Sequence, residues 1–155
     1  MPAAQPTPPV EPPAPAPADA PGARPDTSAQ APGDGPGPAP TRPRITRLAT
    51  APRYTAPLHH AVSTLRLQGH EAGPTERFWV GLSYYLPAGR ADRAPTRAET
   101  VYLVLDGQLA VTAGGHTDTL GPYDSIHLPK GTERDVENRT NRPATLLVII
   151  ANPAT

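Results

Sequence analysis

Short apolar segments separated by turn residues recur through residues 45–153, and no stretch shows a helical period. The strongest segments read "RFWVGLSYYLP", "TVYLVLDGQLAVTAGG" and "ATLLVIIANP". Turn residues interrupt the chain roughly every eight to twelve positions, which is typical of an all-β sandwich or barrel. The first and last of these segments are apolar on both faces, which favours a second sheet or a subunit packed outside. We therefore expect an all-β domain that forms a homodimer.

Proline marks where this domain begins. The chain has 24 prolines, and most of them lie in residues 1–44, among Ala and Gly and without an aromatic residue. Proline removes hydrogen-bond donors and fixes φ, and the segment offers too little apolar surface to offset its ordering entropy. We expect a disordered tail over 1–44 and a folded domain over 45–155. The tail could be a solvated leader, the product of a mis-assigned start, or a partner-binding segment.

Charge and composition exclude several classes of function. The 14 Lys and Arg balance the 14 Asp and Glu, so the basic stripe expected of a nucleic-acid-binding protein is missing. No apolar run approaches the length of a membrane span, and the N-terminal segment lacks the apolar centre of a signal peptide. We therefore expect a cytoplasmic protein with no nucleic-acid or membrane partner. Cysteine is absent, which rules out disulfides and thiolate chemistry.

Two turn-rich stretches carry the motif spacing of a known family. In "GPYDSIHLPKGTERDVEN", Pro129, Gly131, position 134 and Asn138 fit the pattern Pro-x-Gly, two residues, His, three residues, Asn. Gly121 precedes Pro129 at a longer spacing than the family has, and "LPAGRADRAPTRAETVYLVLDG" falls where the other family motif should lie. Residues 78–153 therefore resemble a small single-domain cupin. The resemblance implies a jelly-roll β-barrel with an internal cavity, which in the family usually holds a metal ion.

The family's metal ligands are the residues that this chain replaces. Arg134 stands where the second motif has its histidine, and arginine has no lone pair to give a metal. The other ligand positions fall on Thr100 (with Glu99 one residue away) and on Ala94 and Thr96, or on Arg93 and Pro95 with the longer spacing. We expect no metal and no other cofactor. A displaced metal site built from His127, Glu99 and a loop histidine is the alternative.

The resemblance also implies which side chains face the cavity. It places Thr100, Tyr102, Val104, Arg134 and Val136 inward, and strand alternation adds Ser83 and Tyr85 as the favoured inward pair. The candidate ligand-binding residues are Arg134, Tyr85, Ser83, Thr100, Tyr102 and Glu99.

Arg134 is the central candidate, because a guanidinium inside a largely apolar barrel is costly unless it is paired. It could bind a ligand carboxylate, enolate or phenolate, pair with Glu99, or reach solvent at the barrel mouth.

Candidate proton-transfer groups are Tyr102 and His127, and Arg134 could stabilise a developing oxyanion. His127 lies in "DSIHLP", on a short predicted strand beside the cavity, although an outward-facing histidine is the alternative. The remaining histidines read as surface residues: His59, His60, His70 and His116. The sequence thus predicts a metal-independent barrel that binds a small anionic or enolic organic molecule. It could be an isomerase-like or cyclase-like enzyme of polyketide or aromatic-compound metabolism, or a non-catalytic binding or sensing module.

Overall fold

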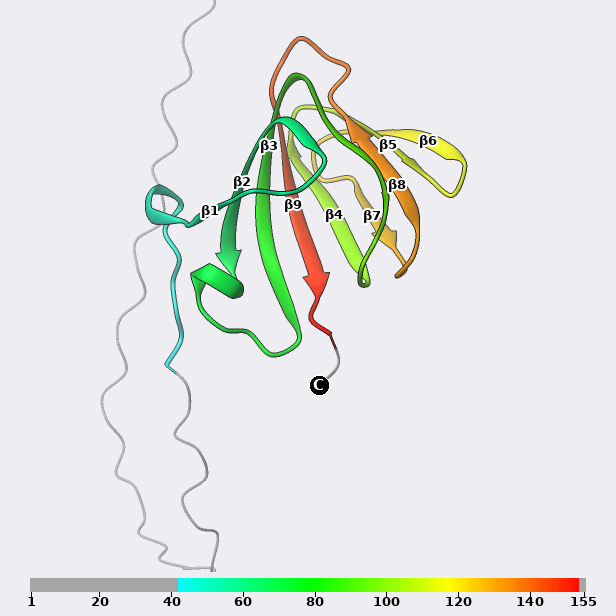
Figure 1. Ribbon diagram of the computed structural model, residues 1–155. Coiled ribbons are helices and arrows are strands. Elements are labelled where there is room, and N and C mark those ends of the chain that lie inside the picture. The colour runs from blue at the N-terminus through cyan, green and yellow to red at the C-terminus, as the bar shows by residue number, and fades with distance from the viewer. Residues whose placement is uncertain (1–41, 154–155) are drawn as a thin grey trace, which may run out of the picture. The chain divides into compact units, whose positions relative to one another are not determined.

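The computed structural model describes residues 42–153, so the predicted tail lies outside the described residues except at its last three positions. Nine strands and two short 3₁₀ helices form this part of the chain, and the all-β prediction is confirmed (Figure 1). In chain order they are η1 Leu48–Thr50, β1 Arg53–Tyr54, β2 His59–Gln68, η2 His70–Ala72, β3 Phe78–Pro95, β4 Thr100–Asp106, β5 Leu109–Ala113, β6 His116–Leu120, β7 Ser125–Leu128, β8 Glu133–Glu137 and β9 Ala144–Ala151. No helix of residues 42–153 is long and apolar enough to cross a membrane.

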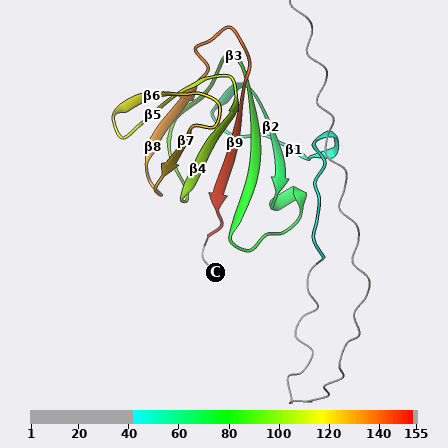
Figure 2. The same ribbon diagram turned by 180° about the vertical axis from the view of Figure 1, so that it is seen from behind.

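One antiparallel sheet in the order β6-β5-β8-β3-β9-β4-β7 curls into a nearly closed barrel (Figures 1 and 2). The 18-residue β3 joins its two halves. The first half of β3 pairs with β9, from Phe78 to Tyr85, and the second half pairs with β8, from Arg90 to Pro95. β2 adds to the free side of β3, and β1 pairs with β2 over two residues. The predicted jelly-roll barrel is confirmed.

The inner face of the barrel follows strict strand alternation. Ser83 and Tyr85 on β3 are each 2% exposed, and Thr100, Tyr102 and Val104 on β4 are equally buried or nearly so. Tyr85, Tyr102 and Val104 form one hydrophobic core with apolar side chains from β5, β7, β8 and β9. The predicted inward positions on both strands are therefore confirmed. β-branched and aromatic residues suit such buried positions on a pleated strand.

Asn138 is a polar hub in this core and is 0% exposed. Its Nδ2 donates to the carbonyls of Leu86 and Arg142, at 3.1 and 2.7 Å, and more weakly to that of Tyr85. Its Oδ1 accepts from the backbone N–H of Thr140 at 3.0 Å. These bonds fasten the β8–β9 connection onto the middle of β3. The motif asparagine therefore has a structural role, because it satisfies backbone groups that burial would otherwise leave unpaired.

Replacing Asn138 by Asp should destabilise the domain by about 2–4 kcal/mol, because the carboxylate would face carbonyl oxygens and lose the donated bonds. Urea unfolding followed by circular dichroism measures the free energy of unfolding. Asn141→Asp, at an exposed position of the same connection, is the control and should change it by less than about 0.5 kcal/mol. Equal stability of the two variants would contradict the structural role of Asn138.

The outer face of β3, β9 and β4 is also apolar. Leu82 pairs with Leu147 and Val80 with Ile149, and Tyr84 beside them is 44% exposed. Continuous apolar strands that are wet on one side favour association with a second copy of the chain.

We expect a homodimer through this face, which Leu147→Glu should convert to a monomer, since a charge there would be desolvated on pairing. Light scattering at micromolar concentration measures the mass, and Thr119→Glu on the exposed β6 strand is the matched control. A monomer mass for the unmodified chain would rule the dimer out.

Candidate functional site

Arg134 lies on β8 opposite Ala94 of β3 and Ala113 of β5, two small residues on either side of it. Its Nε donates to the hydroxyl of Tyr102 at 2.8 Å, and a terminal nitrogen donates to the backbone carbonyl of Asp92 at 3.2 Å. The residue is half-buried, and both of its partners are neutral. The guanidinium is therefore oriented by the protein without being neutralised by it.

No carboxylate of residues 42–153 lies within ion-pair distance of Arg134. Arg134 therefore does not pair with Glu99, which bonds His127 instead. A half-buried charge that keeps only neutral partners has donors left for an oxygen-bearing ligand.

Two tyrosines accompany Arg134 on the inner face. Burial raises the pKa of Tyr85 well above its ordinary value, neighbouring Tyr102 adds to this, and the charge of Arg134 opposes it. Tyr85 therefore keeps its proton at neutral pH. The Tyr102 oxygen already accepts from Arg134, which leaves its own O–H able to donate. The site thus offers phenol donors beside a guanidinium.

His59 reaches the same region from β2. Its Nδ1 bonds the carbonyl of Pro57 at 2.8 Å, so that nitrogen carries the proton and Nε2 is the acceptor in the neutral ring. Burial lowers the pKa of His59; the bond to Pro57 opposes this, and the positive charge of Arg134 adds to it. His59 is therefore neutral at neutral pH and able to accept a proton.

The backbone around this histidine is strained. Leu58 and Ala61 have positive φ values of 61° and 53°, which non-glycine residues rarely adopt. A register shift in the β2–β3 ladder falls between His60 and Val62. Such conformations cost free energy and persist where the surrounding structure enforces them, commonly at functional sites.

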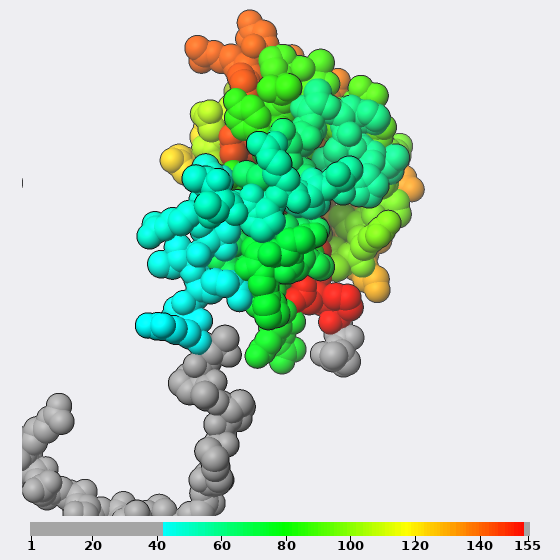
Figure 3. All heavy atoms as spheres, turned by 60° about the vertical axis from the view of Figure 1, so that its left-hand side comes forward, coloured from blue at the N-terminus to red at the C-terminus, as the bar shows by residue number. Residues whose placement is uncertain are grey.

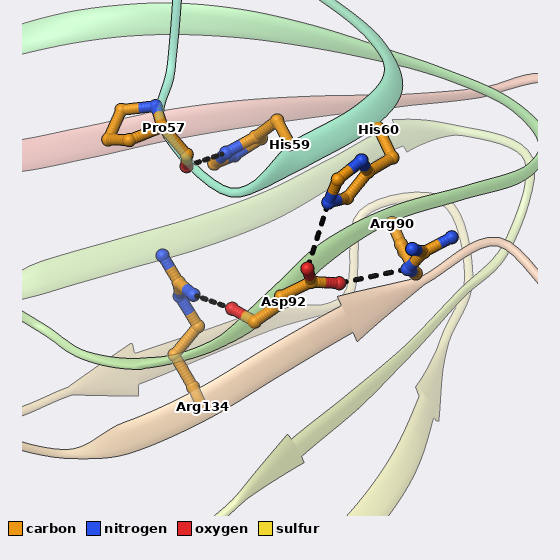
Figure 4. Close-up of polar contacts among 6 residues, drawn as sticks. All are labelled: Pro57, His59, His60, Arg90, Asp92 and Arg134. Carbon is orange, nitrogen blue, oxygen red and sulfur yellow. Dashed lines mark hydrogen bonds and ion pairs between the residues drawn. The ribbon is translucent and has the colours of Figure 1, made fainter.

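Asp92 links His60 to Arg134 (Figure 4). Its carboxylate bonds His60 Nε2 and Arg90 Nε, each at 2.8 Å, and these two bonds lower the pKa of Asp92, that from His60 most. Its backbone carbonyl faces Arg134, and its N–H donates to Leu58 at 2.8 Å. Asp92 lies where the β3–β8 ladder shifts register, between Ala91 and Ala94. That irregularity frees its carbonyl for the side chain of Arg134.

The structure corrects the expected placement of His127 and Glu99. His127 pairs across the strands with Val101, on the outward face of β4 and β7, whereas its neighbour Leu128 points into the core. The side chains of His127 and Glu99 are 55% and 67% exposed and bond each other at 2.8 Å. Alternation along β7 cannot turn both Leu128 and His127 inward. Neither residue lies on the inner face with Arg134.

Sequence reasoning missed His59 and Asp92. His59 reads as a surface residue because β2 lies before the segment that resembles the family motifs. Asp92 lies inside that segment but at no motif position. The adjacent pair His59–His60 ahead of an apolar strand is the signal that could have indicated them. Their approach to Arg134 depends on the pairing of β2 with the far half of β3.

The positions that hold a metal in the resembling family do not fit one here. Ala94 has no ligand atom, the Thr96 hydroxyl donates to Pro129 at 2.6 Å, and the Thr100 hydroxyl donates to Ala98 at 2.9 Å. Within residues 42–153 no cluster of three or more His, Cys, Asp or Glu side chains could hold a metal ion. No metal-dependent step is therefore assigned to these residues.

Comparison with known proteins identifies the family. A family model described as "Cupin domain" matches residues 81–150. Beta-D-galactosidase Rv1717 of Mycobacterium tuberculosis is 62% identical over 110 residues, which cover 71% of this chain and 95% of that protein. The chain belongs to the cupin family.

Solved cupin structures share the fold of this cupin at low identity. A polyketide cyclase from Streptomyces resistomycificus aligns with a TM-score of 0.63 and 18% identity, over 71% of this chain and 80% of that one. A sugar phosphate isomerase from Silicibacter pomeroyi aligns with a TM-score of 0.60 and 24% identity, over 72% and 76% of the two chains. These likenesses establish the fold.

Replacing Arg134 by Met should leave the free energy of unfolding within about 1 kcal/mol of the unmodified value, or raise it. The reason is that a half-buried charge with neutral partners gains little from its site, and an apolar side chain avoids the cost of desolvation. Thermal unfolding measures the difference. A loss well beyond about 3 kcal/mol would instead make Arg134 a structural residue.

Proposed function

We propose that this cupin hydrolyses β-D-galactosides at the site formed by Arg134, Tyr102, Tyr85 and His59, without a metal ion. The observation that carries the proposal is the 62% identity to the Mycobacterium tuberculosis beta-D-galactosidase, which extends over 95% of that protein. The site geometry adds support, because a sugar presents many hydroxyl oxygens and the inner face of the barrel carries a guanidinium that is bonded to a phenol.

In the proposed reaction the glycosidic bond between C1 and the leaving oxygen breaks, and a water oxygen bonds to C1. His59 Nε2 takes the proton of that water, since the ring is neutral and its Nδ1 proton is held by Pro57. The Tyr102 hydroxyl gives its proton to the leaving oxygen. Arg134 stabilises the negative charge that develops on the leaving oxygen and on Tyr102. Proton exchange with solvent then restores both side chains.

This assignment differs from the usual pair of carboxylates in glycosidases. Asp92 is the carboxylate nearest to the site along the chain of contacts, but His60 and Arg90 occupy both of its oxygens. We therefore assign Asp92 to positioning: its carbonyl orients Arg134, and its carboxylate holds His60 and the strained turn.

The test is hydrolysis of p-nitrophenyl β-D-galactopyranoside by the purified protein, with and without a chelator. We expect a rate that the chelator does not change, and at least a tenfold loss of kcat/KM for His59→Gln, Tyr102→Phe and Arg134→Met. His127→Gln is the matched control, because that histidine lies on the outer face. Activity should persist below pH 6.5, the ordinary pKa of histidine, since burial lowers the pKa of His59.

Equal losses for His127→Gln and His59→Gln would refute this site. Hydrolysis lost on chelation and restored by one transition metal would refute metal independence. Binding of the galactoside without cleavage would indicate the non-catalytic alternative, a cupin that binds or senses the sugar.

A second candidate is an isomerase-like or cyclase-like reaction on a small anionic or enolic molecule. It is favoured by the guanidinium of Arg134, which has no carboxylate partner among residues 42–153 and suits a planar anion. Calorimetric titration with aromatic carboxylates and enols tests it. Binding that is weakened at least tenfold by Arg134→Lys would support this candidate, since lysine keeps the charge but loses the fork.

A further inference from the structure

A separate pocket of about 320 Å³ lies in the N-terminal hairpin, between the β1 segment and β2. Its walls include Arg53, Tyr54, Thr55, His59, Ser63 and Thr64. Figure 3 shows this hairpin, coloured cyan to teal, covering one side of the barrel. The volume is at the lower end of the range of roughly 300–1,000 Å³ for small-molecule sites, which suits one monosaccharide unit.

The pocket adjoins the candidate site and is distinct from it. Arg134, Tyr102 and Tyr85 do not line it, whereas His59 is common to both. The carbonyl of Leu58, next to His59, accepts from Asp92, whose own carbonyl accepts from Arg134. His59 is thus the residue through which the pocket and the Arg134 site meet.

The chemistry of the walls matches a neutral sugar. Thr55 and Ser63 offer exposed hydroxyls and Arg53 an exposed guanidinium, and no carboxylate lines the pocket. Tyr54 supplies an aromatic ring. The Cζ of Arg66 lies 3.6 Å from the centroid of this ring, and Trp79 packs against the ring in an edge-on arrangement. Sugars bind through hydrogen bonds from such groups and through apolar C–H faces on aromatic rings. Arg53 does not need an acidic ligand as a partner, because its guanidinium is already exposed to water.

The short β1–β2 pairing and the turn that follows β1 shape the pocket. β1 pairs with β2 over two residues only, Arg53 with Leu65 and Tyr54 with Thr64. The Thr64 hydroxyl also donates to the Tyr54 carbonyl. The connection then turns through Leu58 at a positive φ before it delivers His59. The strain thus falls between the pocket wall and the histidine that both sites share.

We propose that this pocket is a second subsite, which binds the leaving sugar of a β-galactoside while the galactosyl unit lies against Arg134. The inference rests on the proposed function and narrows its substrate class to galactosides whose leaving group is itself a sugar. His59 then lies at the junction of the two units, where the bond is cleaved.

The experiment compares lactose, whose leaving group is glucose, with methyl β-D-galactopyranoside, whose leaving group is methanol. Released galactose is measured for the unmodified chain and for Thr55→Trp, which fills the pocket. We expect kcat/KM at least tenfold higher for lactose in the unmodified chain. Thr55→Trp should abolish this preference by lowering the value for lactose alone.

Thr119→Trp, on the exposed β6 strand, is the matched control and should leave both substrates unchanged. Arg53→Gln is a second variant, which removes a donor without adding bulk and should lower the lactose preference if Thr55→Trp does not fold. Melting temperatures establish that each variant is folded.

The outcomes separate the two proposals. Equal cleavage of both substrates, or a preference that survives Thr55→Trp and Arg53→Gln, overturns the subsite and leaves the proposed hydrolysis intact. If neither substrate is cleaved, the proposed hydrolysis fails, and calorimetry with lactose decides the subsite. Lactose binding that is lost in Thr55→Trp supports the subsite, whereas no binding, or binding unchanged in that variant, overturns it.

Discussion

The barrel depends on β3, which pairs with three other strands and is also bonded by the side chain of Asn138. Its first half pairs with β9 and its second half with β8, while β2 pairs with both halves along the other edge. Asn138 bonds the carbonyls at its centre. Because one strand serves both halves, the ladder has to break register between Ala91 and Ala94 as the sheet curls. Asp92 lies at that break. The curvature that closes the barrel thus also exposes the carbonyl that orients Arg134.

The energetic cost of Arg134 is the strongest physical indication that this end of the barrel is functional. A charge on the inner face loses hydration, and its two neutral partners return only part of that free energy. Nearby groups are strained or desolvated as well: Leu58 and Ala61 in their backbone, and Tyr85 and His59 by burial. Such features gather where function, rather than stability, determines the residues.

The sequence was sufficient for the fold and for the inner face of the motif strands, because period-two alternation assigns Thr100, Tyr102, Ser83 and Tyr85 to one side. It also placed Arg134 correctly, since the spacing from Pro129 to Asn138 fixes its strand. It could not place His59, because that depends on the pairing of a strand outside the motifs with the far half of β3. It could not decide between an inward and an outward His127, because the phase of β7, a four-residue strand, cannot be read from so short a segment.

An arginine in place of metal ligands changes which interactions the inner face of the barrel can make. A metal ion accepts lone pairs and so binds ligand oxygens directly, whereas a guanidinium can only donate hydrogen bonds. It therefore needs a partner that accepts protons and one that delivers them. The strained hairpin before β2 brings a neutral histidine, and β4 brings a tyrosine whose oxygen the guanidinium already holds. The side chains near Arg134 thus supply what a cation that can only donate hydrogen bonds lacks. Tyr102 lies on β4, one of the strands that carry the family motifs, whereas His59 lies on β2, before those motifs.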